Sequence, residues 1–72
     1  MEIKVVYGYD RKIKVLKVDS KFKMILTAWG TSLWQELTDE LHQIVRSEVE
    51  CNRYSVYDMN SKKLMYFWKK RG

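Results

Sequence analysis

The amino-acid sequence predicts a small α+β domain in which one amphipathic helix packs on one face of a mixed or antiparallel sheet. Three observations support this prediction. Two β-rich stretches open the chain, one long segment then shows helical periodicity, and two further β-rich stretches close it. The 72 residues are enough for one domain, residues 1–72, and leave no room for a second hydrophobic core.

The chain begins with a predicted β-hairpin. The stretches EIKVVY and KIKVLKV are rich in β-branched residues, and the segment between them contains the turn formers Gly8 and Asp10. Alternation along a strand predicts one buried and one solvated face. The buried set is expected to be Ile3, Val5, Tyr7, Ile13 and Val15, and the solvated set Lys4, Lys12 and Lys14.

The next segment, KFKMILTAW, is predicted to be a third strand. In that case Phe22, Met24, Leu26 and Ala28 point inward, and the β-branched and aromatic residues between them suit a pleated sheet. A short helix that ends before Gly30 is the alternative, because nine residues are too few for periodicity to separate the two structures.

A helix is predicted from Ser32 onward. Apolar residues recur at helical spacing, namely Leu33, Trp34, Leu37, Leu41, Ile44 and Val45. Ser32 with Gln35 three residues later fits a capping box, and Asn52 is a plausible stop.

A second hairpin is predicted at the end of the chain. RYSVYDM and KLMYFWKK are strand-like, and a turn is expected near Asn60 and Ser61. The order of hairpin, helix and hairpin resembles the β-grasp and immunoglobulin-binding protein G architectures. This resemblance is one of topology, and it is carried by no sequence motif.

Charge is distributed unevenly along the chain. Residues 1–24 hold seven basic and three acidic side chains, residues 25–50 hold one and five, and residues 51–72 hold six and one. If the helix covers one side of the sheet, an acidic helix surface and a basic sheet surface lie on opposite sides of the domain. The net charge of +5 favours polyanionic or acidic partners.

Composition indicates whether the chain folds, whether it spans a membrane and in which redox compartment it is expected. A hydrophobic fraction of 46% argues against disorder, and the longest apolar run falls well short of the roughly 20 residues that cross a bilayer. Cys51 is the only cysteine, so this small chain cannot form an internal disulfide. We therefore expect a cytoplasmic protein in a reducing compartment, with no membrane partner.

Enzymatic and metal chemistry are not predicted. Cys51 and His42 lie nine residues apart, too far along a helix for a nucleophile and its base, and no further ligands are patterned around them for a metal ion. We expect a non-enzymatic protein with no catalytic residue, no metal and no cofactor.

The sequence favours a nucleic-acid-binding function, with DNA or RNA as the partner. Bases stack on exposed aromatic rings while lysines and arginines contact phosphates, and a sheet can present both kinds of side chain. The interface is expected to use a basic, aromatic sheet face and the basic C-terminal tail. The candidate residues are Lys4, Lys12, Lys14, Tyr57, Lys63, Tyr66, Trp68, Lys69, Lys70 and Arg71.

The alternative function is that of a small protein-binding regulator or inhibitor, such as one encoded by a phage or mobile element. It would dock through a sheet edge or through the acidic helix residues Glu36, Asp39 and Glu40. Trp29 and Trp34 could flank a homodimer interface as readily as they could fill the core. Core or cross-strand packing is also the simpler explanation for any single aromatic residue of the last two strands.

Overall fold

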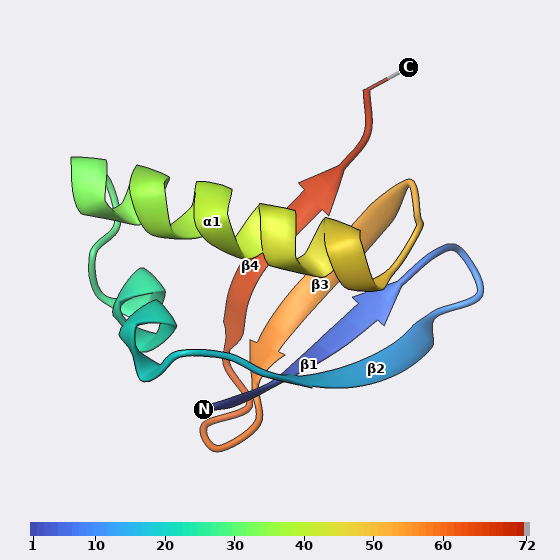
Figure 1. The fold of residues 1–72 in the computed structure, drawn as a ribbon, viewed down its shortest axis with the longest axis horizontal. Coiled ribbons are helices and arrows are strands. Elements are labelled where there is room, and N and C mark those ends of the chain that lie inside the picture. Colours follow the sequence, from blue (N-terminus) through green and yellow to red (C-terminus); the bar gives the residue numbers. More distant parts are fainter. Residues whose placement is uncertain (72) are drawn as a thin grey trace.

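The computed structural model describes residues 1–71, which form two β-hairpins and two helical segments. The order is β1 (Glu2–Tyr7), β2 (Lys12–Lys17), the 3₁₀ helix η1 (Ser20–Leu26), α1 (Ser32–Glu48), β3 (Arg53–Asp58) and β4 (Leu64–Lys69). Figure 1 shows α1 lying across the sheet, with η1 beside the start of α1. The predicted small α+β architecture is confirmed.

The strands form one sheet in the order β2-β1-β3-β4, and each neighbouring pair is antiparallel. The first strands of the two hairpins are therefore the central pair, and β2 and β4 are the edges. The hairpin–helix–hairpin order is confirmed. All neighbouring pairs are antiparallel, so of the two predicted kinds of sheet, mixed or antiparallel, the antiparallel one is observed.

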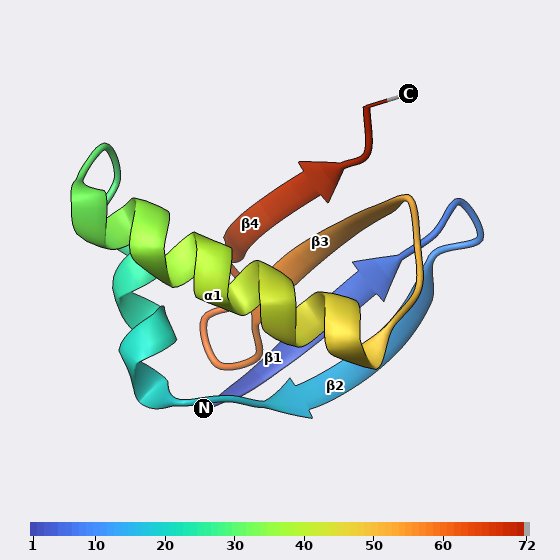
Figure 2. The same cartoon turned by 45° about the horizontal axis from the view of Figure 1, so that its top comes forward.

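The core lies between the sheet and the two helices. Ile3, Val5, Tyr54 and Val56 come from the central strands and are almost completely buried. From α1 they meet residues that recur every three or four positions, namely Leu37, Leu41, Val45 and, just past its end, Val49. The turned view in Figure 2 shows α1 and η1 on the same side of the sheet.

The segment predicted as a third strand is the 3₁₀ helix η1, so that preference was wrong and the helical alternative was right. Asp19 accepts a hydrogen bond from the Lys21 backbone N–H at 2.8 Å and caps the helix. Phe22 and Ile25 are buried, whereas Met24 is 48% exposed. The spacing of three places both buried residues on one side of a helix with three residues per turn.

The N-cap of α1 lies one residue before the predicted cap, Ser32. Thr31 is the N-cap, and its hydroxyl accepts a hydrogen bond from the Trp34 backbone N–H at 3.2 Å. Ser32 is therefore the first helical residue, and the Gln35 side chain donates to Asp39 instead of closing a capping box. The helix ends at Glu48 with Val49 as its C-cap, before the predicted stop at Asn52.

Tight turns with left-handed residues join the strands of each hairpin. The first turn contains Gly8 at φ 76° and Arg11 at φ 55°, and the second contains Lys62 at φ 61°. The second turn includes Asn60 and Ser61, as predicted. No helix within residues 1–71 is both long and apolar enough to span a membrane.

Candidate nucleic-acid interface

The sheet face turned away from α1, called the open face below, is the candidate interface. Ile3 and Val5 are buried under the helix, so the alternating residues Lys4 and Val6 point to the opposite side. Directly paired residues of antiparallel strands share a face. The remaining open-face positions follow from the strand register and are Glu2, Ile13, Val15, Lys17, Arg53, Ser55, Tyr57, Leu64, Phe67 and Lys69.

The open face is basic and carries exposed apolar side chains. At these positions, all within the described residues, the basic side chains are Lys4, Lys17, Arg53 and Lys69, and the single acidic one is Glu2. Phe67 is 47% exposed and Leu64 is 53% exposed on the half formed by β3 and β4. The face can therefore attract a polyanion and also offer an aromatic ring to it.

Cationic side chains lie over the aromatic rings of this face. The Lys4 ammonium is 5.3 Å from the centre of the Tyr57 ring. The Arg53 guanidinium is 5.8 Å from the centre of the Phe67 ring and 5.6 Å from that of Tyr9 in the first turn. Each distance is within the range of cation–π attraction. The result is a row of two cation–ring pairs, Lys4 with Tyr57 and Arg53 with Phe67, across β1, β3 and β4.

A small pocket continues this row at the turn between β3 and β4. It has a volume of about 190 Å³ and is lined by Lys4, Tyr57, Asp58, Met59 and Lys62. Asp58 is buried, and its carboxylate accepts a hydrogen bond from the Asn60 backbone N–H, which holds the turn. Lys4 and Lys62 provide two ammonium groups at the pocket wall, and these can bind an anionic group.

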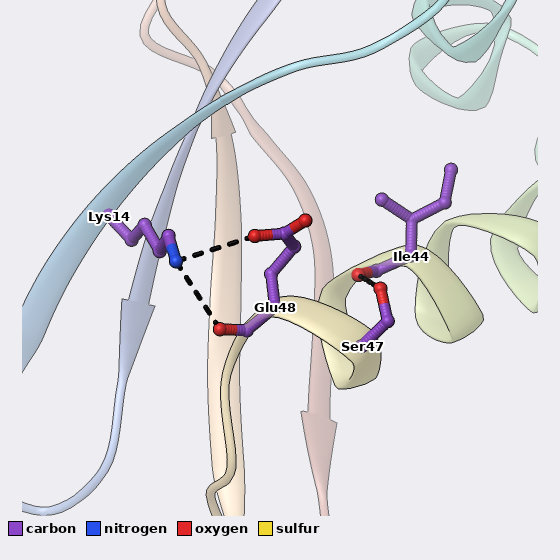
Figure 3. Close-up of polar contacts among 4 residues, drawn as sticks. All are labelled: Lys14, Ile44, Ser47 and Glu48. Carbon is purple, nitrogen blue, oxygen red and sulfur yellow. Dashed lines mark hydrogen bonds and ion pairs between the residues drawn. The ribbon is translucent and has the colours of Figure 1, made fainter.

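Lys12 and Lys14 do not lie on the open face, so the prediction that they share a face with Lys4 was wrong. They pair with Tyr7 and Val5, which face the helix, whereas Ile13 and Val15 pair with open-face residues. Lys14 reaches the end of α1, where its ammonium is 3.4 Å from both the carboxylate and the backbone carbonyl oxygen of Glu48 (Figure 3). This contact holds the Lys14 ammonium at the C-terminal end of α1, which is the negative end of the helix dipole.

Tyr66 and Trp68 also lie on the helix side of the sheet. Trp68 pairs with Tyr54 and Tyr66 with Val56, and both partners are buried in the core. Their rings belong to a continuous aromatic cluster, in which Trp68 is 5.6 Å from Tyr54 and Tyr66 is 6.1 Å from Trp34. These two candidate stacking residues therefore pack against the domain's own side chains, and of the three predicted rings only Tyr57 lies on the open face.

The remaining predicted basic residues lie at the two ends of β4. Lys63 is exposed in the segment between β3 and β4. Lys69 pairs with Arg53 on the open face, and Lys70 and Arg71 follow directly and are exposed. The Lys70 backbone N–H donates to the Asn52 carbonyl at 2.7 Å, which continues the pairing of β3 and β4 past the end of the strand.

Sequence reasoning missed Phe67, Arg53 and Lys17 as members of the face. The alternation of the last strand already left two possibilities, with either Tyr66 and Trp68 or Phe67 pointing away from the helix. The strand register decides between the two possibilities. Trp68 pairs with the buried Tyr54 and Tyr66 with the buried Val56, so Phe67 points away from the helix. A bulge between Val56 and Tyr57 also moves Leu64 to the open face.

The acidic residues of α1 lie on the opposite side of the domain. Glu36, Asp39 and Glu40 are exposed. Glu40 forms an ion pair with Lys21 of η1 at 2.9 Å, and this hydrogen bond raises the pKa of Lys21. Part of the acidic charge is therefore already paired within the chain.

His42 packs inside the aromatic cluster. Its Nδ1 lies 2.7 Å from the Tyr54 hydroxyl, and its ring centre lies 4.9 Å from that of Trp68. Burial and the nearby Arg46 charge lower the pKa of His42, and burial raises the pKa of Tyr54. A neutral imidazole that accepts from a protonated phenol fits both directions.

Within residues 1–71 no group of three or more His, Cys, Asp or Glu side chains could hold a metal ion. Cys51 is a free, partly buried thiol, and the Arg46 guanidinium donates to its backbone carbonyl oxygen.

Comparisons with protein-family models, with curated proteins and with solved structures find no match to this chain.

Proposed function

We propose that this protein binds nucleic acid through the open face. The observation that carries the proposal is the row of two cation–ring pairs, with Lys4 over Tyr57 and Arg53 over Phe67. Phosphates need positive charge and bases need an apolar surface on which to stack, and this face supplies both in one plane.

The distribution of charge supports the same orientation. The acidic residues of α1 lie on the far side of the domain, so a polyanion is drawn toward the sheet and repelled from the helix. Lys70 and Arg71 extend the positive charge beyond Lys69 at one end of β4, and Lys62 and Lys63 extend it at the other.

Salt dependence combined with neutralisation of single charges tests the proposal. Fluorescence anisotropy with a labelled oligonucleotide at several salt concentrations gives the slope of log K against log salt. Each phosphate contact contributes roughly 0.7 to 0.9 to that slope, so Lys17→Gln and Lys69→Gln should each flatten it by about one contact and weaken binding.

Lys23→Gln is the matched control. It removes the same charge from an exposed position on η1, away from the open face. Binding that weakens equally in all three variants would mean that net charge alone drives the interaction. Absence of binding at low salt would refute the proposal.

A protein contact is the second candidate function, and the edge strand β2 favours it. Ile13 is 62% exposed and Val15 is 46% exposed on the open face, beside Val6 of β1. Exposed aliphatic residues next to an unpaired strand edge are typical of protein docking. A second copy of the chain is the simplest partner to test. Sedimentation should then show a dimer that Ile13→Lys dissociates, and a monomer at high concentration would count against this self-association.

A further inference from the structure

We infer that the nucleic acid bound by the open face is single-stranded, and that two of its bases stack on Phe67 and Tyr57. This inference rests on the proposed function and names the form of its ligand. It follows from the spacing of the rings, from the cations beside them and from the charge of the helix.

The two rings are diagonal neighbours across β3 and β4. Phe67 pairs directly with Ser55, and Tyr57 is two residues beyond Ser55 on the same face. The backbone positions of diagonal neighbours on a sheet are roughly 7–8 Å apart. This separation is about twice the 3.4 Å rise between stacked bases of one strand in a duplex. Adjacent bases can reach both rings only if the strand is extended and its bases are unstacked.

The residues around the rings suit such a strand. Ser55 is short and lies between Arg53 and Tyr57 along β3, so it leaves space between the two rings and offers a hydroxyl to a base edge. Arg53 lies over the Phe67 ring and Lys4 over the Tyr57 ring, so a stacking base displaces each flexible cation from its ring and leaves one positive charge near each nucleotide.

The pocket at the second turn extends the binding path past Tyr57. Tyr57 and Lys4 form part of its lining, so a nucleotide stacked on Tyr57 lies at its mouth. Lys62, which also lines the pocket, can then meet the next phosphate. The path therefore runs from Arg53 and Phe67, across Tyr57, to Lys62.

Duplex recognition has no comparable support in the described residues. A duplex hides the faces of its bases from Phe67 and Tyr57, and proteins that read a duplex commonly insert a helix into its major groove. The one long helix of residues 1–71 is α1, whose exposed side carries Glu36, Asp39 and Glu40. Phosphates would repel that surface.

The experiment compares single-stranded and duplex probes on the same variants. Fluorescence anisotropy is measured with a labelled oligothymidylate about 12 nucleotides long, with the matching oligouridylate, and with the thymidylate annealed to its complement, because single-strand sites commonly span roughly 4–16 nucleotides. We expect the single strands to bind at least about tenfold more tightly than the duplex. DNA and RNA both present base faces, so tighter binding of either single strand supports the inference.

Phe67→Leu and Tyr57→Leu keep apolar bulk and remove the aromatic face. Loss of one base–aromatic stack should weaken single-strand binding roughly 5- to 150-fold. Trp29→Leu is the matched control, because Trp29 is an exposed ring outside the sheet that stacks on Trp34 of α1, and it should change binding less than about twofold. Amide spectra of each variant confirm that the fold is retained.

The outcomes separate this inference from the proposed function. Equal affinity for duplex and single strand, with the two leucine variants unaffected, would overturn the inference and leave nucleic-acid binding standing. Equal weakening by Trp29→Leu and Phe67→Leu would also overturn it. No binding to any probe at low salt would refute the proposed function itself.

Discussion

Phe22 of η1 offers a direct test of the fold at the point where the sequence was most ambiguous. Its side chain is 1% exposed and lies in the core beside Ile25, whereas the neighbouring Met24 is 48% exposed. Truncating a buried phenylalanine to alanine costs about 3–5 kcal/mol. A domain of this length has a total stability of roughly 4–11 kcal/mol, so Phe22→Ala should remove a large part of the free energy of unfolding.

A milder variant keeps the measurement quantitative. Phe22→Leu should cost about 1–2 kcal/mol through lost apolar burial, which lowers the melting temperature of a domain of this size by roughly 4–16 °C. Met24→Ala should cost about 1 kcal/mol or less, because half of its side chain already meets solvent.

Urea unfolding followed by tryptophan fluorescence measures these differences. The slope of the unfolding free energy against urea should stay constant among the variants, so that midpoints report stability alone. If residues 20–26 formed a strand with Phe22 and Met24 both inward, Met24→Ala would be as costly as Phe22→Leu. That result would refute the 3₁₀ assignment of this segment.

Three further predictions concern the N-cap of α1, the partly buried His42 and the helix-side Lys14. Thr31→Ala should lower stability by about 1 kcal/mol, and Ser32→Ala should change it little, because only the Thr31 hydroxyl accepts the Trp34 N–H; equal effects in thermal unfolding would contradict the cap assignment. The lowered pKa of His42 means that the unfolded chain takes up this proton more readily than the folded protein, so His42 stabilises the fold least at low pH. The contribution of His42 to the unfolding free energy should therefore be fully present above the ordinary histidine pKa of 6.5 and be lost as pH falls below it. Between about pH 7.5 and 5.5, the urea midpoint of His42→Gln should fall less than that of the wild type. Equal falls would exclude His42 as the cause. Lys14→Gln should cost less than about 1 kcal/mol because its ion pair is partly exposed, and in anisotropy it should weaken nucleic-acid binding less than Lys69→Gln; the reverse order would place the interface on the helix side.

The helix and the two hairpins could be predicted because their patterns are long or are bounded by turn residues. Leu37, Leu41 and Val45 repeat at helical spacing over more than two turns, and all three are buried. The segment of η1 could not be assigned in the same way. Its residues suit a strand locally, and the contact of Phe22 and Ile25 with the core, which decides the outcome, is tertiary.

The length of the first turn determines which residues of β2 point toward the helix side of the sheet. Tyr7 pairs with Lys12 and Val5 with Lys14, so odd-numbered residues of β1 share a face with even-numbered residues of β2. A turn one residue longer or shorter would exchange the two faces of β2. The alternation of apolar residues in this strand suggested that Ile13 is buried, but β2 is an edge strand and its apolar side meets solvent.

The sequence predicted the type of candidate surface, but it did not identify all of the residues that form it. Charge and aromatic content indicated a basic sheet face, and Lys4, Tyr57 and Lys69 are on it. Phe67 takes the place of Tyr66 and Trp68, because the larger rings of β4 fill the space beside Tyr54 under α1. Alternation separates these two sets of residues, but it does not say which set the helix covers.

An amide-shift titration of labelled protein with a short single strand, at low and at moderate salt, tests the central claim most directly. The account predicts shifts at Arg53, Ser55, Tyr57 and Phe67, with smaller changes along α1, and shifts that fade as salt rises. Shifts concentrated at Glu36 and Glu40 of α1, or no shifts at low salt, would contradict the claim that the open face binds nucleic acid.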